Sequence, residues 1–177
     1  MPRLFAAHVG SGREEAMARR IMRVSEGLVR DAFCLRGQVM RRCEGDWHVE
    51  ERVLYSGYVF IEADEAARVS EALELLAAAP DVLDGRLNAG AGKEPIPLSP
   101  AEEAAIRELG GRRHLVGLSR GRIEAGRLVV DEGPLRGRER LVTRIDRHKR
   151  LAWLGGAASG LPGRGVPSVA LEVVSKS

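Results

Sequence analysis

The chain has few aromatic residues and only two cysteines. Aromatic side chains make up 4% of its 177 residues, and Cys34 and Cys43 are too isolated for a disulfide framework or a zinc site. The four histidines are scattered, and no cysteine or carboxylate joins them at metal-ligand spacing. No segment approaches the ~20 apolar residues of a membrane helix, and no signal-peptide core opens the chain. We therefore expect a cytoplasmic, monomeric protein, not an enzyme, with no metal, cofactor or membrane association.

The net charge of +3 conceals an asymmetry between the two parts of the chain. Residues 1–111 carry 14 basic and 19 acidic side chains, a net of −5, whereas residues 112–177 carry 14 basic and 6 acidic side chains, a net of +8. This division favours a basic C-terminal module that meets phosphate groups, with an ordinary solvated surface as the alternative.

The first 109 residues show the order of a ferredoxin-like α+β sandwich. The expected elements are a strand at 3–9, a helix opened by a Ser11–Glu14 capping box, strands at 31–42 and 47–62, a helix capped by Asp64 and ended by Pro80, and a strand at 81–87. Ser99, Pro100 and Glu102 predict the start of a further helix that runs to about residue 109.

The segment 53–64 has two apolar faces, which predicts a central strand covered on both sides, and it holds both tyrosines of the chain. We expect a β-bulge at Ser56-Gly57 that turns Tyr55 and Tyr58 to one face. The sequence Tyr-Ser-Gly-Tyr-Val resembles the Phe-Pro-Gly-Tyr-Val signature of NusG-type transcription elongation factors, with serine in place of proline. The resemblance implies that the sandwich is a NusG N-terminal (NGN) domain. It also implies that Tyr55 and Tyr58, with Leu4 and Phe5, bind the clamp helices of the RNA polymerase β′ subunit. From the residues alone, a core role is the alternative.

From residue 122 onward, short strands alternate with turns, which predicts a small SH3-like β-barrel. The strands are expected at 128–131, 141–146, 151–154 and 167–174. This part resembles a KOW domain through residues 126–130, 133–135, 142–146 and 166–174. Arg140 stands where the KOW motif carries glycine, and a left-handed backbone there would strain arginine by ~1 kcal/mol. We therefore expect an NGN domain at 1–109, a linker at 110–121 and a KOW domain at 122–177.

The densest basic cluster, Asp-Arg-His-Lys-Arg at 146–150, lies between two expected strands and is followed by Leu-Ala-Trp. It resembles the corresponding segment of LoaP-type antiterminators, which are specialised NusG paralogues. We expect the cluster and a nearby turn to bind RNA phosphates, with a solvated hairpin end as the alternative. The expected RNA-binding residues are Arg136, Arg138, Arg140, Arg147, His148, Lys149 and Arg150. Trp153 is expected to fill the barrel. Trp47 is expected to pack at a sheet edge, with base stacking as its alternative.

The resemblance implies a factor that binds RNA polymerase and promotes processive antitermination. Its KOW domain would contact nascent RNA or a structured leader element, and non-template DNA is a further candidate partner. Two alternative functions are a housekeeping NusG-type factor and a ribosome-associated KOW protein. A small ferredoxin-like enzyme is a third, disfavoured by the lack of a catalytic motif.

Overall fold

The computed structural model describes residues 2–79, 94–159 and 167–176, and the chain divides into two compact units. The first unit comprises residues 1–34 and 55–103, and the second comprises residues 35–54 and 104–177. Each unit is therefore assembled from two separate stretches of sequence. The expected strand at 81–87, the helix stop at Pro80 and most of the glycine-rich loop after residue 155 lie outside the described residues.

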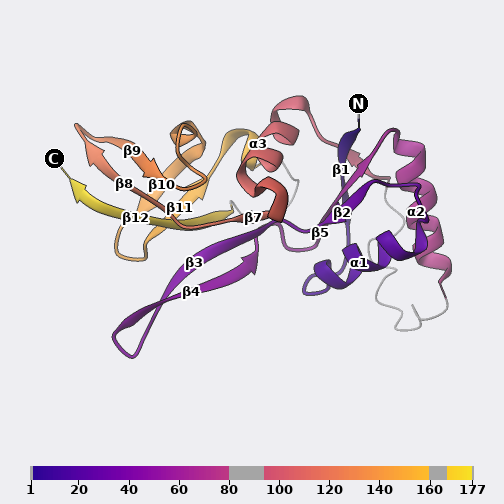
Figure 1. Ribbon diagram of the computed structural model, residues 1–177, viewed down its shortest axis with the longest axis horizontal. Coiled ribbons are helices and arrows are strands. Elements are labelled where there is room, and N and C mark those ends of the chain that lie inside the picture. Colours follow the sequence, from indigo (N-terminus) through magenta and orange to yellow (C-terminus); the bar gives the residue numbers. More distant parts are fainter. Residues whose placement is uncertain (1, 80–93, 160–166, 177) are drawn as a thin grey trace. The chain divides into compact units, whose positions relative to one another are not determined.

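The first unit is a four-stranded antiparallel sheet with two helices packed on it (Figure 1). Its strand order is β2-β5-β1-β6, which places β5 in the interior, as its apolar sequence predicts. The core lies between the sheet and the two helices, and Ile21, Ile61 and Leu76 are at most 1% exposed within it. The elements of this unit are β1 (Arg3–His8), α1 (Glu14–Val24), β2 (Asp31–Phe33), β5 (Tyr58–Ala63), α2 (Ala66–Ala78), β6 (Ile96–Pro97) and the start of α3 (Pro100–Gly110).

Two of the three expected helix caps are wrong. Helix α1 begins after Arg13, and no side-chain cap is formed there, because the Glu14 carboxylate binds elsewhere. Helix α2 begins after Glu65 rather than Asp64, whose carboxylate instead pairs with Arg30 at 2.9 Å. The third cap is confirmed at α3, where the backbone N–H of Ser99 donates to Glu102 at 2.7 Å and that of Glu102 donates to the serine hydroxyl at 3.3 Å.

The two long strands expected at 31–42 and 47–62 are wrong, because each is divided into two strands. The first becomes β2 and β3 (Arg36–Cys43), and the second becomes β4 (Asp46–Val53) and β5. The chain leaves the first unit after Cys34 and returns at Tyr55. Ser56-Gly57 forms a tight turn rather than a bulge: Gly57 has φ 80°, and the N–H of Tyr58 donates to the carbonyl of Tyr55 at 3.1 Å.

Strands β3 and β4 form a long antiparallel hairpin of the second unit (Figure 1). Its turn lies at Glu44 and Gly45, as the sequence predicts, and both residues have positive φ. At its base, β3 pairs in parallel with β7 (Leu115–Val116). The Arg52 guanidinium donates to the carbonyl and hydroxyl of Ser168, the latter at 2.5 Å. The hairpin is thus tied to the sheet of its own unit.

That sheet has the strand order β10-β11-β12-β8-β9. Its strands are β8 (Ser119–Glu124), β9 (Arg127–Glu132), β10 (Val142–Asp146), β11 (Leu151–Leu154) and β12 (Ser168–Lys176), with short 3₁₀ turns η3 (Gly111–Arg113), η4 (Glu139–Leu141) and η5 (Gly156–Ala158). The four expected strands are therefore confirmed. The segment expected as a linker holds η3, β7 and the start of β8; the domain limits stay a prediction. Arg140 lies in η4 without a positive φ, so the expected backbone strain is absent, and Gly137 takes the left-handed conformation instead (φ 73°).

Candidate nucleic-acid interface

The basic cluster at 146–150 forms the turn between β10 and β11. Asp146 shapes this turn, because its carboxylate accepts a hydrogen bond from the backbone N–H of Lys149 at 2.9 Å. That bond, with a second from the backbone of His148, holds the pKa of the Asp146 carboxyl below its ordinary value. Arg147, His148 and Lys149 are exposed on the turn. We call these three residues the basic tip; the prediction of a hairpin end that carries cations is confirmed.

Arg150 belongs to the same turn but already has partners within the unit. Its guanidinium lies 2.7 Å from a carboxylate oxygen of Glu172 and 4.6 Å from the ring centroid of Trp47. Only 30% of its side chain is exposed. Trp47 thus packs under a cation, and Arg150 is far less available to a phosphate than the three residues before it.

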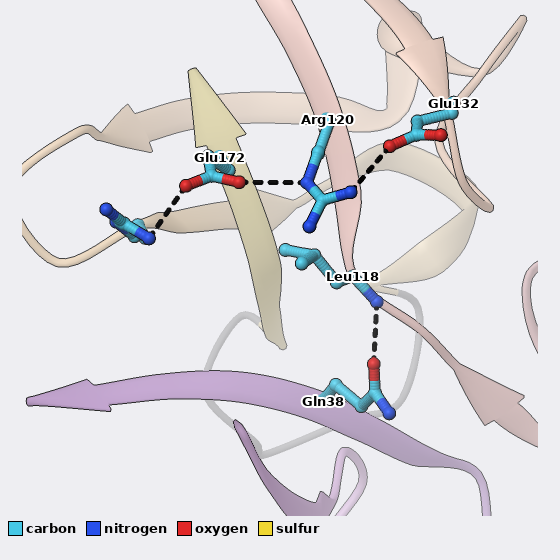
Figure 2. Close-up of polar contacts among 6 residues, drawn as sticks. Gln38, Leu118, Arg120, Glu132 and Glu172 are labelled. Atoms are coloured by element: carbon cyan, nitrogen blue, oxygen red, sulfur yellow. Dashed lines mark hydrogen bonds and ion pairs between the residues drawn. The ribbon is translucent and has the colours of Figure 1, made fainter. Parts of the chain in front are cut away.

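Glu172 on β12 is shared between two arginines. Its second oxygen accepts from Nε of Arg120 at 2.9 Å, and Arg120 also pairs with Glu132 at 2.9 Å (Figure 2). These bonds, first that from Glu132 and then that from Glu172, raise the pKa of the Arg120 guanidinium. Below them, the Gln38 side-chain oxygen accepts from the backbone N–H of Leu118 at 2.9 Å (Figure 2). Exposed pairs of this kind add little stability, but they decide which cations stay available.

The arginines of the turn before β10 form a separate group. Arg138 is held by Glu108 at 2.8 Å and by the carbonyls of Pro134 and Arg136 at 3.3 Å. Arg136 and Arg140 are exposed, and Arg136 interacts electrostatically with the Glu139 carboxylate. The five residues of β10 separate this group from the basic tip, a distance of about 17 Å along the strand. The seven expected RNA-binding residues therefore form two groups, and two of the seven are already paired.

The four residues expected to bind polymerase are all buried. The exposed fraction is 0% for Leu4, 3% for Phe5, 4% for Tyr55 and 6% for Tyr58. Tyr55 meets Phe60 edge-on at 5.4 Å between centroids, and burial, with a smaller contribution from Glu102, raises the pKa of its phenol. This placement supports the core alternative. Side chains so enclosed have almost no surface left to bury against a partner, and polymerase contact by these residues stays a prediction.

Sequence reasoning missed the role of Glu14. Its side chain is 3% exposed, and its carboxylate accepts from the backbone N–H of Gly57 at 2.6 Å and from the Ser56 hydroxyl at 3.3 Å. Burial alone would raise the pKa of this carboxyl, but the hydrogen bonds outweigh burial and lower the pKa. Glu14 thereby fixes the turn between the two tyrosines. No local pattern signals this contact, because the partners are 43 residues apart.

No protein-family model and no curated protein matches the chain. Among solved structures, one similar to it is that of NusG from Thermotoga maritima, described as "Domain interaction in Thermotoga maritima NusG". The two share 19% of their residues, with a TM-score of 0.50, and the likeness covers 98% of this chain and 94% of that one. The chain has a NusG-like fold. The predicted fold class, an α+β sandwich followed by a small β-barrel, is thereby confirmed.

Neither a metal-binding cluster nor a membrane-spanning helix is found among the described residues. Residues 2–79, 94–159 and 167–176 hold no group of three metal-ligating side chains. None of the helices within those ranges combines the length and apolar content of a membrane span. The candidate surface consists of the two groups of exposed basic residues described above.

Proposed function

We propose that this chain is a transcription elongation factor of the NusG type that acts as a specialised antiterminator. The proposal rests on the NusG-like fold, which extends along nearly the full length of both chains. The first unit would bind RNA polymerase and favour one conformation of its clamp by binding that conformation more tightly. The second unit would contact RNA. Because one chain carries both units, RNA contact takes place at a high effective concentration beside the polymerase.

The basic tip is the proposed RNA contact. Its three side chains are exposed, and Lys149 and His148 also interact electrostatically with the Asp146 carboxylate of the same turn. A compact, exposed turn rich in basic side chains suits phosphates of a single strand or a hairpin loop, and such binding weakens steeply with salt. Arg136 and Arg140 would add a second contact, and Arg138 and Arg150 would join only on leaving their carboxylate partners.

The polymerase contact is proposed for the first unit as a whole, with non-template DNA as a further partner. Leu4, Phe5, Tyr55 and Tyr58 would support the docking surface from beneath, because their burial leaves them little area of their own. The turn that Glu14 fixes between the tyrosines is part of that support. A substitution at one of these four residues is therefore expected to weaken polymerase binding only if it also displaces the exposed residues around it.

The test is transcription by purified RNA polymerase across an intrinsic terminator, with and without the protein. We expect read-through to increase with the wild type and to fall in the double variant Arg147→Gln, Lys149→Gln. The control double variant Arg127→Gln, Lys176→Gln removes the same charge from exposed positions outside the tip. Read-through that is equal with and without the wild-type protein, together with sedimentation on ribosomes rather than polymerase, would reject the proposal.

A further inference from the structure

Arg144 and Trp153 form a stacked pair on the hairpin that carries the basic tip. They are opposite each other in the β10–β11 ladder, and the arginine guanidinium lies 4.7 Å from the centroid of the indole. The ladder register shifts between Val142 and Arg144, so Thr143 is an extra residue, and its hydroxyl donates to the carbonyl of Trp153 at 3.2 Å. Irregularities of this kind re-aim side chains next to functional sites.

This pair is open to solvent, unlike a core contact. Trp153 is half-buried rather than enclosed in the barrel, and Arg144 is exposed. Since the guanidinium covers one face of the indole and is itself exposed, it offers a flat cationic surface supported by an aromatic ring. Unpaired bases of nucleic acids stack on arginine planes and on aromatic rings, and such stacking tolerates any base.

The second arginine–tryptophan pair of the unit shows why this one is distinctive. Arg150 lies over Trp47 at a similar distance, 4.6 Å, but its guanidinium is also bound to Glu172. Arg144 has no carboxylate partner among the described residues. A planar cation without an anionic partner remains available to a ligand. The two pairs share a stacked geometry, but within the described part of the chain only Arg144 is free of a carboxylate and thus available to bind a ligand.

The position of the pair relative to the basic tip also fits one strand of nucleic acid. Arg144 precedes Arg147 by three residues, about 10 Å along an extended chain. A base stacked on Arg144 and phosphates bound at the tip therefore belong to neighbouring nucleotides. We propose that Arg144, supported by Trp153, is a stacking site for an unpaired base of the strand whose phosphates the basic tip binds. This inference rests on the proposed RNA contact.

The test distinguishes the contribution of base stacking to the binding affinity from that of phosphate contacts. The full chain is titrated with a single-stranded oligouridylate and with an abasic strand of the same length, which keeps the backbone charge but lacks bases. The variant Arg144→Lys keeps the charge and loses the plane, and Arg127→Lys is the matched control on an exposed part of β9. We expect Arg144→Lys to weaken binding of the oligouridylate by about fivefold or more and to leave binding of the abasic strand unchanged. Arg127→Lys should change neither.

A second readout reports directly on Trp153. In a Trp47→Phe background, we expect oligouridylate to change the emission of Trp153 and the abasic strand to leave it nearly unchanged. An equal loss for both strands in Arg144→Lys, or a loss for neither, overturns the stacking site. The tip variant Arg147→Gln, Lys149→Gln distinguishes the two proposals, because it should weaken both strands alike. If it weakens neither while Arg144→Lys acts as expected, the base contact at Arg144 stands, but its place on a strand bound by the tip is overturned. If the wild type binds neither strand, both proposals fail.

Discussion

The guanidinium of Arg150 lies 2.7 Å from a carboxylate oxygen of Glu172, so one cation of the basic cluster already has an anionic partner in its own unit. The same carboxylate also binds Arg120. Glu172 therefore competes with phosphate for Arg150. The number of basic side chains in the C-terminal part overstates how many cations are available to a nucleic acid, because several of its arginines are paired in this way.

We expect Glu172→Gln to strengthen RNA binding, because it removes the negative charge that holds Arg150. If Arg150 then contacts one more phosphate of a single strand, the slope of log affinity against log salt should steepen by about 0.7. Titrations at several salt concentrations measure this slope. Glu132→Gln is the matched control, since Glu132 pairs with Arg120 and not with Arg150. Weaker binding by Glu172→Gln would mean that Glu172 positions Arg150 instead of competing for it.

We expect Glu14→Gln to destabilise the first unit by about 1–2 kcal/mol at neutral pH, because a charge-assisted hydrogen bond to the Gly57 N–H becomes a neutral one. The folded state lowers the pKa of this carboxyl, so its contribution is present above the unfolded value of about 4.3 and is lost as the pH falls through the folded value. Denaturant unfolding at several pH values should therefore give a smaller acid-side loss for the variant.

Glu15→Gln is the control for that experiment. Glu15 is adjacent in sequence, but its side chain is 49% exposed and lies 3.8 Å from Arg19 in a surface pair. We expect a change within about 0.5 kcal/mol. Equal effects of the two substitutions would contradict the role assigned to Glu14.

We expect Tyr55→Ala to cost about 3–5 kcal/mol of folding stability and Tyr55→Phe less than about 1.5 kcal/mol, because only alanine leaves a cavity beside Phe60. Chemical denaturation measures both. Loss of polymerase binding in the alanine variant would then reflect unfolding, whereas the phenylalanine variant tests the phenol itself. A cost below about 1 kcal/mol for alanine would contradict the buried position.

The buried phenol of Tyr55 also predicts that the folding stability of the first unit falls at alkaline pH. Burial raises its pKa, so its contribution to stability is complete below the unfolded pKa of about 10 and is lost as the pH rises toward the folded value. Tyr55→Phe should remove this part of the alkaline loss. Unfolding curves of the two proteins at rising pH would show it as a difference in slope.

We expect Gly121→Ala to destabilise the second unit strongly, by about 1–3 kcal/mol, since a Cβ at this position would collide with the backbone of Val129 and Val130. Gly117→Ala is the control, because the nearest atom to its added Cβ is the Gln38 side-chain oxygen at 3.6 Å, an ordinary contact. Thermal unfolding of both variants gives the comparison. Similar melting temperatures would contradict the close approach of β8 and β9.

Local patterns predicted the elements that depend on nearby residues. The strands of the second unit follow from short alternating segments between turns, and the cap of α3 follows from Ser99 and Glu102 within one turn. The division of the two long strands was hidden, because Leu35 and Leu54 continue the apolar pattern where the chain passes between units. Neither the amino-acid composition nor the spacing of apolar residues marks the positions where the chain passes from one unit to the other.

The candidate site shows the same division between local and distant causes. The sequence predicted the hairpin end and its cations, but it did not predict that Glu108 and Glu172 neutralise Arg138 and Arg150, because these pairs join separate elements. The resemblance around Tyr55 and Tyr58 predicted a docking role, whereas the burial of both residues depends on packing across the sheet. The stacked pair of Arg144 and Trp153 needed the strand register, and a cation opposite an aromatic residue in a predicted hairpin is the signal that would have found it.

The hydrogen bonds from Arg52 to Ser168 join residues 116 positions apart, and they tie the first-made part of the second unit to its last strand. During synthesis, the β3–β4 hairpin leaves the ribosome long before β12 is made, so Arg52 cannot yet form its hydrogen bonds to Ser168. Closing a loop of this length is slow compared with local pairing. We therefore expect the second unit to complete its folding only after β12 has been synthesised, and a fragment that starts at residue 122 to lack part of its own framework.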